Sequence, residues 1–178
     1  MLSSWAVVPT CPPLVLRRCH VCPAATFRAS GKFRVNANHK LLDVWLLVLC
    51  AGCGTTAKLS VLERTNVRAI PPYLLDRLHD NDAGLIAEVL RDPVVQRRNR
   101  IALDWAGAWR LVTDGTDPVE DVAVRFAAPI PVRPVRLIAE GCKLSRAEVE
   151  RLIAGGRIVS AHRLSGKLSG DFTFTVKR

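Results

Sequence analysis

The chain of 178 residues has no apolar segment long enough to cross a bilayer. Its longest uninterrupted apolar run, Val44 to Ala51, has eight residues, whereas a membrane-spanning helix needs about 20. The first residues also lack the basic start and the long apolar stretch of a secretory signal. We therefore expect a cytoplasmic protein with no membrane segment.

Motifs of the common enzyme classes are missing as well. The sequence has no glycine-rich phosphate loop, no nucleophile elbow and no dinucleotide fingerprint. In His79-Asp80-Asn81-Asp82 a carboxylate could orient a histidine base, but Asp and Asn between two expected helices are more typical of helix caps. The sequence favours a non-catalytic protein and leaves a hydrolase or transferase that uses His79 as a distant alternative.

Acidic residues are outnumbered, with 16 Asp and Glu against 26 Lys and Arg, which gives a net charge of +10. Residues 1–65 carry eight basic and two acidic groups, and residues 133–178 carry ten and four. Residues 66–132 carry eight basic and ten acidic groups, so two basic ends flank an acidic middle. This distribution favours a polyanionic partner such as nucleic acid, although solubility and an arginine-rich proteome would also produce a basic chain.

Four of the six cysteines form two tight pairs, Cys19-His20-Val21-Cys22 and Cys50-Ala51-Gly52-Cys53. A sharp turn points both sulfurs of a pair the same way, and two pairs complete a tetrahedral site with no open position for water or substrate. The pattern predicts a structural Zn²⁺ in a zinc ribbon with four ligands, Cys19, Cys22, Cys50 and Cys53.

The alternative for either pair is a redox dithiol, which usually needs one reactive pair at a helix N-terminus. Both pairs lie at expected strand ends, and paired thiols without an export signal favour a reducing compartment. Because four thiolates fill the site, we expect His20 and His39 at the surface. Cys11 and Cys142 have no nearby partner in the sequence and are expected to be free or packed thiols.

The first third of the chain is typical of β-structure. Phe33-Arg34-Val35 and Leu41–Cys50 flank a turn-rich cluster and predict a hairpin, and Ala57–Arg64 alternates as a further strand. Both faces of Val44–Leu49 are apolar, so we expect a central strand covered on both sides.

Short helices are expected in the middle of the chain. One follows Pro71-Pro72, one follows the candidate caps Asp80-Asn81-Asp82, and one begins at Asp92-Pro93. Ile101–Thr113 is compatible with helix or strand, Asp114–Pro118 is expected to be a turn or linker, and Asp121–Phe126 alternates as a strand. Trp45, Trp105 and Trp109 are expected in the core.

Ser145 and Glu148 form a capping box for an amphipathic helix that ends at Gly155-Gly156. The segment from Arg133 to the C-terminus resembles the S-four RNA-binding domain. Its motif is matched in order by Ser145, Arg146, Val149, Leu152, Ile153, Gly156 and Ile158. The R-L-D start of the preceding family helix is replaced by Arg133-Pro134-Val135, and the usual V-N-G hairpin by Val159–Arg163. The resemblance implies that four basic side chains face RNA phosphates: Lys143, Arg146, Arg151 and Arg157.

The whole chain also resembles an uncharacterised bacterial family, domain of unknown function 1062. The matching segments are Cys19–Cys22, Phe33–Asn38, Leu42–Leu46, Cys50–Gly54 and His79–Asp82. This resemblance implies an architecture and no activity.

Together these features predict an α+β protein with three domains: a zinc-ribbon-like β domain over residues 1–65, a helical connector over 66–118 and an S-four-like module over 119–178. The expected function is non-catalytic binding of structured RNA, either ribosomal or transfer RNA, with association to the ribosome as one option. The alternative is a protein-interaction adaptor with a structural zinc ribbon and no nucleic-acid ligand. The sequence leaves the RNA, the protein partner and the oligomeric state open.

Overall fold

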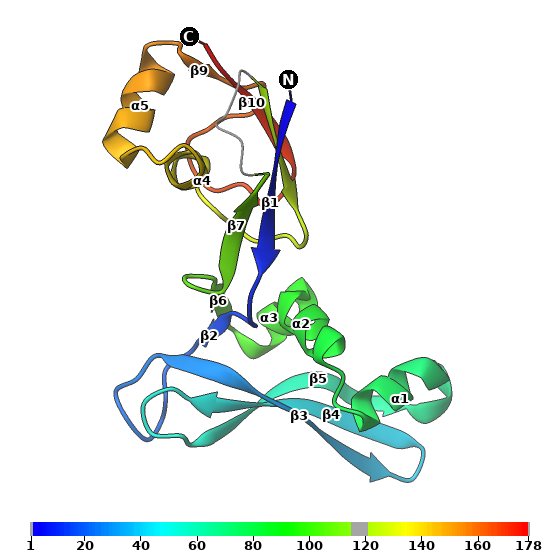
Figure 1. The fold of residues 1–178 in the computed structure, drawn as a ribbon. Helices are drawn as coiled ribbons and strands as arrows, with labels where there is room; N and C mark the ends of the chain where they lie inside the picture. The colour runs from blue at the N-terminus through cyan, green and yellow to red at the C-terminus, as the bar shows by residue number, and fades with distance from the viewer. Residues whose placement is uncertain (1, 115–120, 178) are drawn as a thin grey trace. The chain divides into compact units, whose positions relative to one another are not determined.

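The computed structural model describes residues 2–114 and 121–177, which form an α+β protein as the sequence predicts (Figure 1). The chain divides into two compact units. Unit 1 consists of Met1–Cys11 and Trp105–Arg178, and unit 2 consists of Pro12–Asp104. Unit 2 is therefore inserted into unit 1, after its first strand. Among the described residues, none of the helices has the length and apolar character needed to span a membrane.

Unit 2 contains a five-stranded antiparallel sheet in the order β5-β4-β3-β2-β6. Its strands are β2 (Leu14–Leu16), β3 (Thr26–Asn38), β4 (Leu41–Cys50), β5 (Thr56–Asn66) and β6 (Ala102–Asp104). The predicted hairpin is formed by β3 and β4, and the predicted further strand is β5. The apolar strand β4 lies in the interior of the sheet, between β3 and β5, as expected.

Burial alternates strictly along β4. Its even-numbered residues from Leu42 to Cys50 are buried, and its odd-numbered residues are only half-buried. The buried set packs against apolar side chains of the helices of unit 2, among them Leu78, Ile86 and Leu90. These helices lie on one side of the sheet (Figure 1). The expected cover on both faces of β4 is seen on the helical side, whereas the odd-numbered residues on the other face remain half-buried.

The three α-helices of unit 2 begin where the sequence predicts. They are α1 (Pro72–His79), α2 (Ala83–Arg91) and α3 (Pro93–Asn99). A short 3-10 helix that was not predicted, η1 (Val67–Ala69), precedes them. The Leu85 N–H donates to the Asp82 carboxylate at 2.7 Å, and the Val94 N–H donates to that of Asp92 at 2.7 Å. Each carboxylate therefore satisfies a backbone donor that the first helical turn leaves unpaired.

Side chains from the helices satisfy backbone groups that irregularities in the sheet leave free. The Phe33 N–H follows a bulge in β3 and donates to Asn81 Oδ1 at 2.7 Å. On the edge strand β5, Asn99 accepts from the Ser60 N–H at 2.7 Å and donates to the Ser60 carbonyl at 2.9 Å. Arg98 donates to the carbonyl of Val61 at the neighbouring bulge. These bonds attach the helices to the sheet and cover part of its open edge.

Unit 1 contains a second five-stranded sheet in the order β7-β1-β8-β10-β9. Its strands are β1 (Leu2–Pro9), β7 (Trp109–Thr113), β8 (Asp121–Phe126), β9 (Ile158–Val159) and β10 (Phe172–Val176). β1 pairs in parallel with β8 and antiparallel with β7. The ambiguous segment Ile101–Thr113 therefore forms two strands, β6 in unit 2 and β7 in unit 1.

Helices α4 (Pro134–Gly141) and α5 (Arg146–Ala154) accompany this sheet. Trp5 is 1% exposed and packs edge-on against Phe174, with ring centroids 5.3 Å apart. A Cβ at Gly141 would overlap the indole ring of Trp5, so the glycine permits the close contact between α4 and β1. The N-cap half of the predicted capping box is confirmed at Ser145, whose hydroxyl accepts from the Glu148 N–H at 3.2 Å.

The two-unit division differs from the three predicted domains. The predicted connector, residues 66–118, is not one body, because α1–α3 pack on the sheet of unit 2 and β7 belongs to the sheet of unit 1. β1 pairs with β7 and β8 and not with the cysteine-bearing sheet. The predicted linker Asp114–Pro118 lies, apart from Asp114, outside the described residues, as does the boundary at 118/119.

Candidate metal centre

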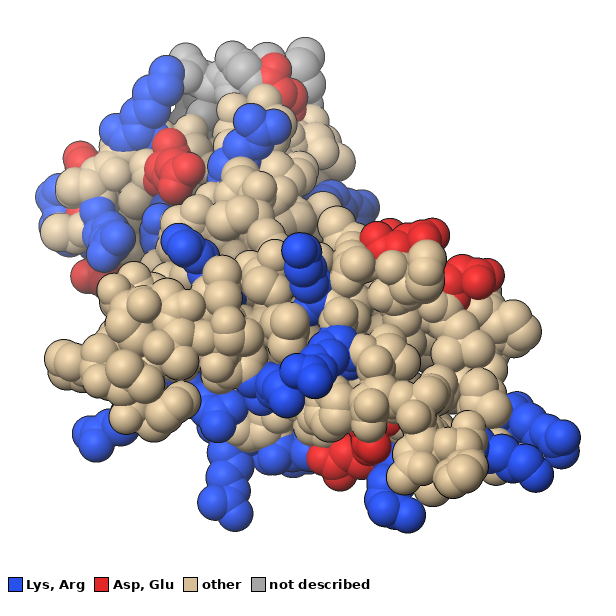
Figure 2. Space-filling view, turned by 90° about the horizontal axis from the view of Figure 1, so that it is seen from below, with Lys and Arg blue, Asp and Glu red and all other residues tan. Residues whose placement is uncertain are grey.

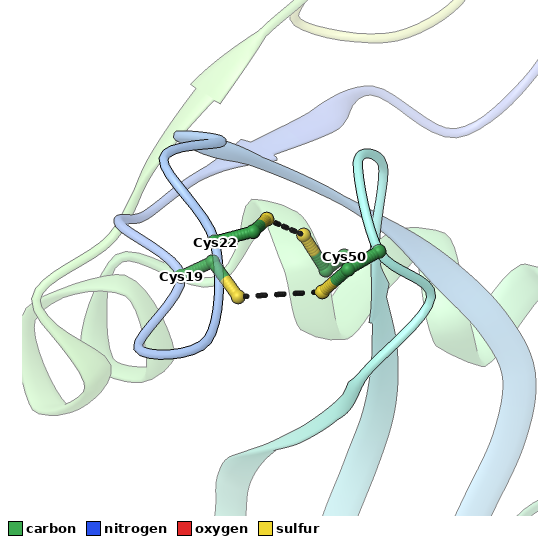
Figure 3. A group of neighbouring side chains, drawn as sticks. Cys19, Cys22 and Cys50 are labelled. Atoms are coloured by element: carbon green, nitrogen blue, oxygen red, sulfur yellow. Dashed lines mark hydrogen bonds between the residues drawn. The ribbon is translucent and has the colours of Figure 1, made fainter.

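Two turns of unit 2 bring the four paired cysteines together. Cys19 and Cys22 lie in the turn between β2 and β3, and Cys50 and Cys53 lie at the end of β4 and in the turn after it. Cys19 Sγ is 3.7 Å from Cys53 Sγ, and Cys22 Sγ is 3.6 Å from Cys50 Sγ (Figure 3). All four Sγ atoms lie within 4.8 Å of one another. The four residues predicted as one ligand set therefore share one site.

The two turns are built alike. The Cys19 N–H donates to the Ala24 carbonyl at 2.8 Å, and the Cys50 N–H donates to the Thr55 carbonyl at 2.9 Å. In each case the first cysteine of the pair bonds to the residue five positions later, which closes the turn behind the second cysteine. The Val21 N–H also points at Cys19 Sγ, at 3.4 Å. Amides directed at the sulfurs favour the thiolate form that binds metal.

Glycines allow the two turns to meet. A Cβ at Gly52 would lie 2.9 Å from Ala24 Cβ and 3.2 Å from Cys22 Sγ, both in the opposite turn. Gly54 has a φ of +75°, a conformation that side chains other than glycine rarely adopt. Gly54 thus permits the tight turn after Cys53, and Gly52 provides the space between the two turns.

The thiols of this cluster differ in acidity. The Thr55 hydroxyl, 3.2 Å from Cys53 Sγ, and the Thr55 amide lower the pKa of Cys53 to about 6. The amides of Cys53 and Gly52 lower the pKa of Cys50. The Ala24 amide also lowers the pKa of Cys22. Burial and the neighbouring thiols outweigh this effect and raise the pKa of Cys22 to about 12. Adjacent thiolates repel one another, so complete ionisation of the cluster needs a cation among the sulfurs.

The cluster has the composition and the spacing to hold a metal ion. Four sulfurs from two rigid turns offer a complete coordination sphere for a soft or borderline cation. Neither His20 nor His39 belongs to the cluster, and both are exposed, as predicted.

The four basic residues predicted to face RNA are all exposed in unit 1. Lys143 precedes α5 with a φ of +56°, Arg146 begins the helix, and Arg151 lies on it with a loose ion pair to Glu148 at 3.8 Å. Arg157 comes after the helix and donates from Nε to the Lys177 carbonyl at 3.0 Å. Arg146 and Arg151 are five residues apart, so they point in directions about 140° apart around the helix axis. Arg146 and Arg151 therefore lie at opposite edges of the exposed side of α5 and do not form a single row.

The cluster His79–Asp82 serves the fold, because Asp82 caps α2 and Asn81 holds β3. His79 Nδ1 lies 3.2 Å from Asp80 Oδ1, but both side chains are largely exposed, at 90% and 75%. A general base acts best where surrounding groups shift its pKa and exclude water, and this pair lies in open solvent.

Sequence reasoning missed a second basic surface, on the face of the unit 2 sheet that points away from α1–α3. Trp45 was expected in the core, but it is half-buried on this face, whereas Trp105 and Trp109 are buried as predicted. Arg34 pairs with Trp45 across the sheet, and Lys58 Nζ lies over the Trp45 ring, 5.1 Å from its centroid. The signal in the sequence was the set of basic residues in β3 and β5, Arg28, Arg34 and Lys58, whose common face becomes visible only when the strand register is known.

Comparison with protein families places the chain in one of them. The family described as "Protein of unknown function (DUF1062)" matches residues 35–164, most of the chain, so this protein belongs to that family. The matched region includes the second cysteine pair and begins after the first. No curated protein and no solved structure matched the chain.

Proposed function

We propose that the four-cysteine cluster binds a structural Zn²⁺ and that the two turns with their strands form a zinc ribbon. With zinc–sulfur bonds of about 2.3 Å, a regular tetrahedron has sulfurs about 3.8 Å apart. The Cys22–Cys50 and Cys19–Cys53 sulfurs, 3.6 and 3.7 Å apart, lie close to this value, and all four sulfurs lie within 4.8 Å of one another. Four protein ligands leave no position for a substrate, so the ion would stabilise unit 2 without catalysing a reaction. This fit is the observation that carries the proposal.

Metal analysis tests the site directly. The purified protein should contain close to one zinc per chain, and Cys50→Ser should lose it, because a hydroxyl is a poor replacement for a buried thiolate. Cys142→Ser is the matched control, since Cys142 belongs to unit 1 and is not part of the cluster, and this variant should keep its zinc. A metal-free protein with a fully folded unit 2 would refute the proposal.

We further propose that the protein binds structured RNA through the basic C-terminal module of unit 1, without catalysis. The proposal is supported by the exposure of Lys143, Arg146, Arg151 and Arg157 around α5. The order of α4, α5 and the short strands β9 and β10 supports the S-four-like character of this segment. The candidate groups are charges and not base-reading aromatic side chains. Recognition would therefore depend on phosphates and on the shape of the RNA.

A salt titration with matched variants tests RNA binding. If about four phosphates are neutralised, the slope of log affinity against log salt should be near −3. Arg146→Ala with Arg157→Ala should weaken binding of a transfer or ribosomal RNA and lower the slope, while the melting temperature is unchanged. The control removes two exposed arginines of unit 2, Arg68→Ala with Arg97→Ala, and should bind almost as the parent does. Equal affinity of the parent and the Arg146/Arg157 variant would reject the module as the RNA site.

A protein-interaction adaptor is the second candidate, favoured by large apolar side chains exposed on the helices of unit 2. Tyr73 on α1 is 65% exposed, and Val94 at the start of α3 is 48% exposed. Apolar groups of this kind can anchor a protein partner. Pull-downs that retain a protein after nuclease treatment, together with binding that ignores salt, would favour this function over RNA binding.

A further inference from the structure

We propose that the face of the unit 2 sheet directed away from α1–α3 binds single-stranded nucleic acid. We call this surface the open face, and it consists of the outward residues of three strands: Arg28, Arg34 and Asn36 of β3, Leu41, Asp43, Trp45, Leu47 and Leu49 of β4, and Thr56, Lys58 and Ser60 of β5. The site goes beyond the proposed C-terminal RNA site, because it lies in the other unit and takes a different form of ligand.

The centre of the open face is apolar. Trp45, Leu47 and Leu49 stand at alternate positions of β4 and are half-buried, while the residues between them point into the core. Alternate residues of a strand are about 7 Å apart, so the three side chains form a continuous strip. Trp45 is the one aromatic residue of the strip. An aromatic ring in a sheet surface is a platform on which an unpaired base can stack.

Basic side chains flank this strip on both sides. Arg34 lies opposite Trp45 and Arg28 lies opposite Leu49 on β3, and Lys58 lies opposite Leu47 on β5. All three are exposed, and Lys58 extends over the Trp45 ring. Figure 2 views the molecule from the side on which the open face lies, and basic side chains are spread across that view. Cations beside an apolar strip can pair with phosphates while the bases lie on the strip.

The acidic groups near the open face are engaged within the unit. Asp43 Oδ1 accepts the Arg64 N–H at 2.8 Å, and Glu63 Oε1 accepts the Ser60 hydroxyl at 2.6 Å. These bonds fix the two carboxylates but leave them charged.

The open face carries three basic side chains, Arg28, Arg34 and Lys58, against the carboxylate of Asp43, so its net charge is positive around an apolar strip. Such a surface complements a polyanion with exposed bases. A duplex has its bases stacked and paired inside. Its phosphates could contact the basic side chains, but no base would lie on the apolar strip. This difference is why the geometry favours a single strand.

Fluorescence titration of the full chain with zinc bound tests the inference. The probes are an oligouridylate and an oligothymidylate of about 12 nucleotides, within the usual size of such sites, and a duplex of equal length. Trp45 is the only tryptophan of unit 2, and the other three are buried in unit 1. Single strands should quench part of the emission, and Trp45→Leu should abolish this quenching and weaken binding about 10-fold. Comparison of the two oligonucleotides shows whether RNA or DNA is preferred.

A second variant, Arg34→Ser with Lys58→Ser, keeps the apolar strip and removes two positive charges. Both positions are exposed, so we expect this variant to fold as the parent does. The same variant should weaken single-strand binding about 10-fold and lower the salt slope by about 1.4, the value for two phosphate contacts. Arg68→Ala with Arg97→Ala removes the same charge elsewhere in unit 2 and should change neither quantity. Arg146→Ala with Arg157→Ala should also leave single-strand binding intact, which separates this site from the module of unit 1.

Several results would overturn the inference. These are an unchanged Trp45 emission, an equal loss of affinity in the Arg68/Arg97 control, or equal affinity for the duplex. Sedimentation that shows a dimer dissociated by Trp45→Leu would assign the open face to a second copy of the chain. If an acidic peptide binds the open face and neither oligonucleotide displaces it, the open face belongs to a protein partner.

Discussion

Two glycines show how single residues determine contacts in this protein. Gly52 lets the two cysteine turns approach, and Gly141 lets α4 approach β1. In both places the neighbour is a rigid group, the Cβ of Ala24 or the indole of Trp5, which cannot rotate away. A methyl group at either position would therefore separate two elements and not merely displace a flexible side chain.

We predict that Gly141→Ala destabilises unit 1. The added methyl group would overlap the buried Trp5 ring, and overpacking of this kind costs about 1–3 kcal/mol. The free energy of unfolding from urea titration measures the effect. Gly170→Ala is the control, because a Cβ there meets nothing within 4 Å, and its stability should match the parent. Equal stability of the two variants would contradict the packing of Trp5 on α4.

At the scale of elements, the helices of unit 2 depend on a few polar side chains. Arg77 of α1 connects to α2, with Nη2 2.6 Å from Asp82 Oδ1 and 2.9 Å from Glu88 Oε1. Asn99 at the end of α3 bonds to both backbone groups of Ser60 on β5. The side-chain amide of Asn99 thus makes the two hydrogen bonds that a neighbouring strand would make with Ser60. Because hydrogen bonds are directional, they fix the position of the helix on the sheet edge more closely than apolar packing does.

We predict that Asn99→Ala loosens α3 from β5. The variant leaves the N–H and carbonyl of Ser60 without their side-chain partner, at a cost of about 1–3 kcal/mol when the groups stay shielded from water. Hydrogen exchange of the Ser60 amide should accelerate together with a lower urea midpoint. Arg97→Ala, an exposed change on the same helix, should leave both measurements unchanged. A protected Ser60 amide in Asn99→Ala would show that the bond contributes nothing.

The Arg77 connection predicts a pH dependence of stability. The Leu85 amide and the Arg77 side chain lower the pKa of Asp82 below its ordinary value, so the folded state favours the carboxylate. The charge therefore stabilises the fold above the ordinary carboxyl pKa of about 3.9, and this stabilisation is lost as the pH falls through the lowered pKa. Asp82→Asn keeps a capping oxygen but no charge. It should be less stable than the parent at neutral pH, and the difference in urea midpoint should vanish in strong acid. A difference that does not change with pH would exclude the ionic contribution.

The local elements were predictable from the sequence because local chemistry fixes them. The caps at Asp82, Asp92 and Ser145 and the alternation along β3, β4 and β5 identify helices and strands without knowledge of distant partners. The four cysteines were predictable for the same reason, since a pair spaced by two residues defines its own turn. The open face was missed because it depends on which residues of β3 and β5 lie beside Trp45, and bulges in both strands shift that register.

At the scale of the whole molecule, the domain division could not be predicted from local patterns. The pairing of β1 with β8 joins segments more than 100 residues apart, and nothing in residues 2–9 identifies that partner. A boundary drawn from composition therefore assigned β1 to the cysteine-bearing unit and β7 to the helical connector. The actual units are defined by non-local strand pairing, with unit 2 inserted after β1.

We predict that metal removal acts on unit 2 and spares unit 1. The four sulfurs join the β2–β3 turn to the β4–β5 turn, so a chelator would free both turns. No described residue of unit 1 contributes a ligand to the cluster. Hydrogen exchange after chelation should increase in residues 14–66 and stay unchanged in β8 and β10. Readdition of zinc should restore protection. Equal loss of protection in both units would contradict a site that serves one unit.

The insertion also sets the order in which the molecule can mature during translation. β1 emerges before unit 2, but its neighbours β7 and β8 are synthesised only after all of unit 2. Unit 2 has its strands, helices and cysteines in one uninterrupted stretch, so it can fold while β1 is still unpaired. Trp5 and Val7, which end in the core, stay accessible to chaperones throughout that interval. A strand that is synthesised before unit 2 is thus completed in its sheet only after unit 2 has been made.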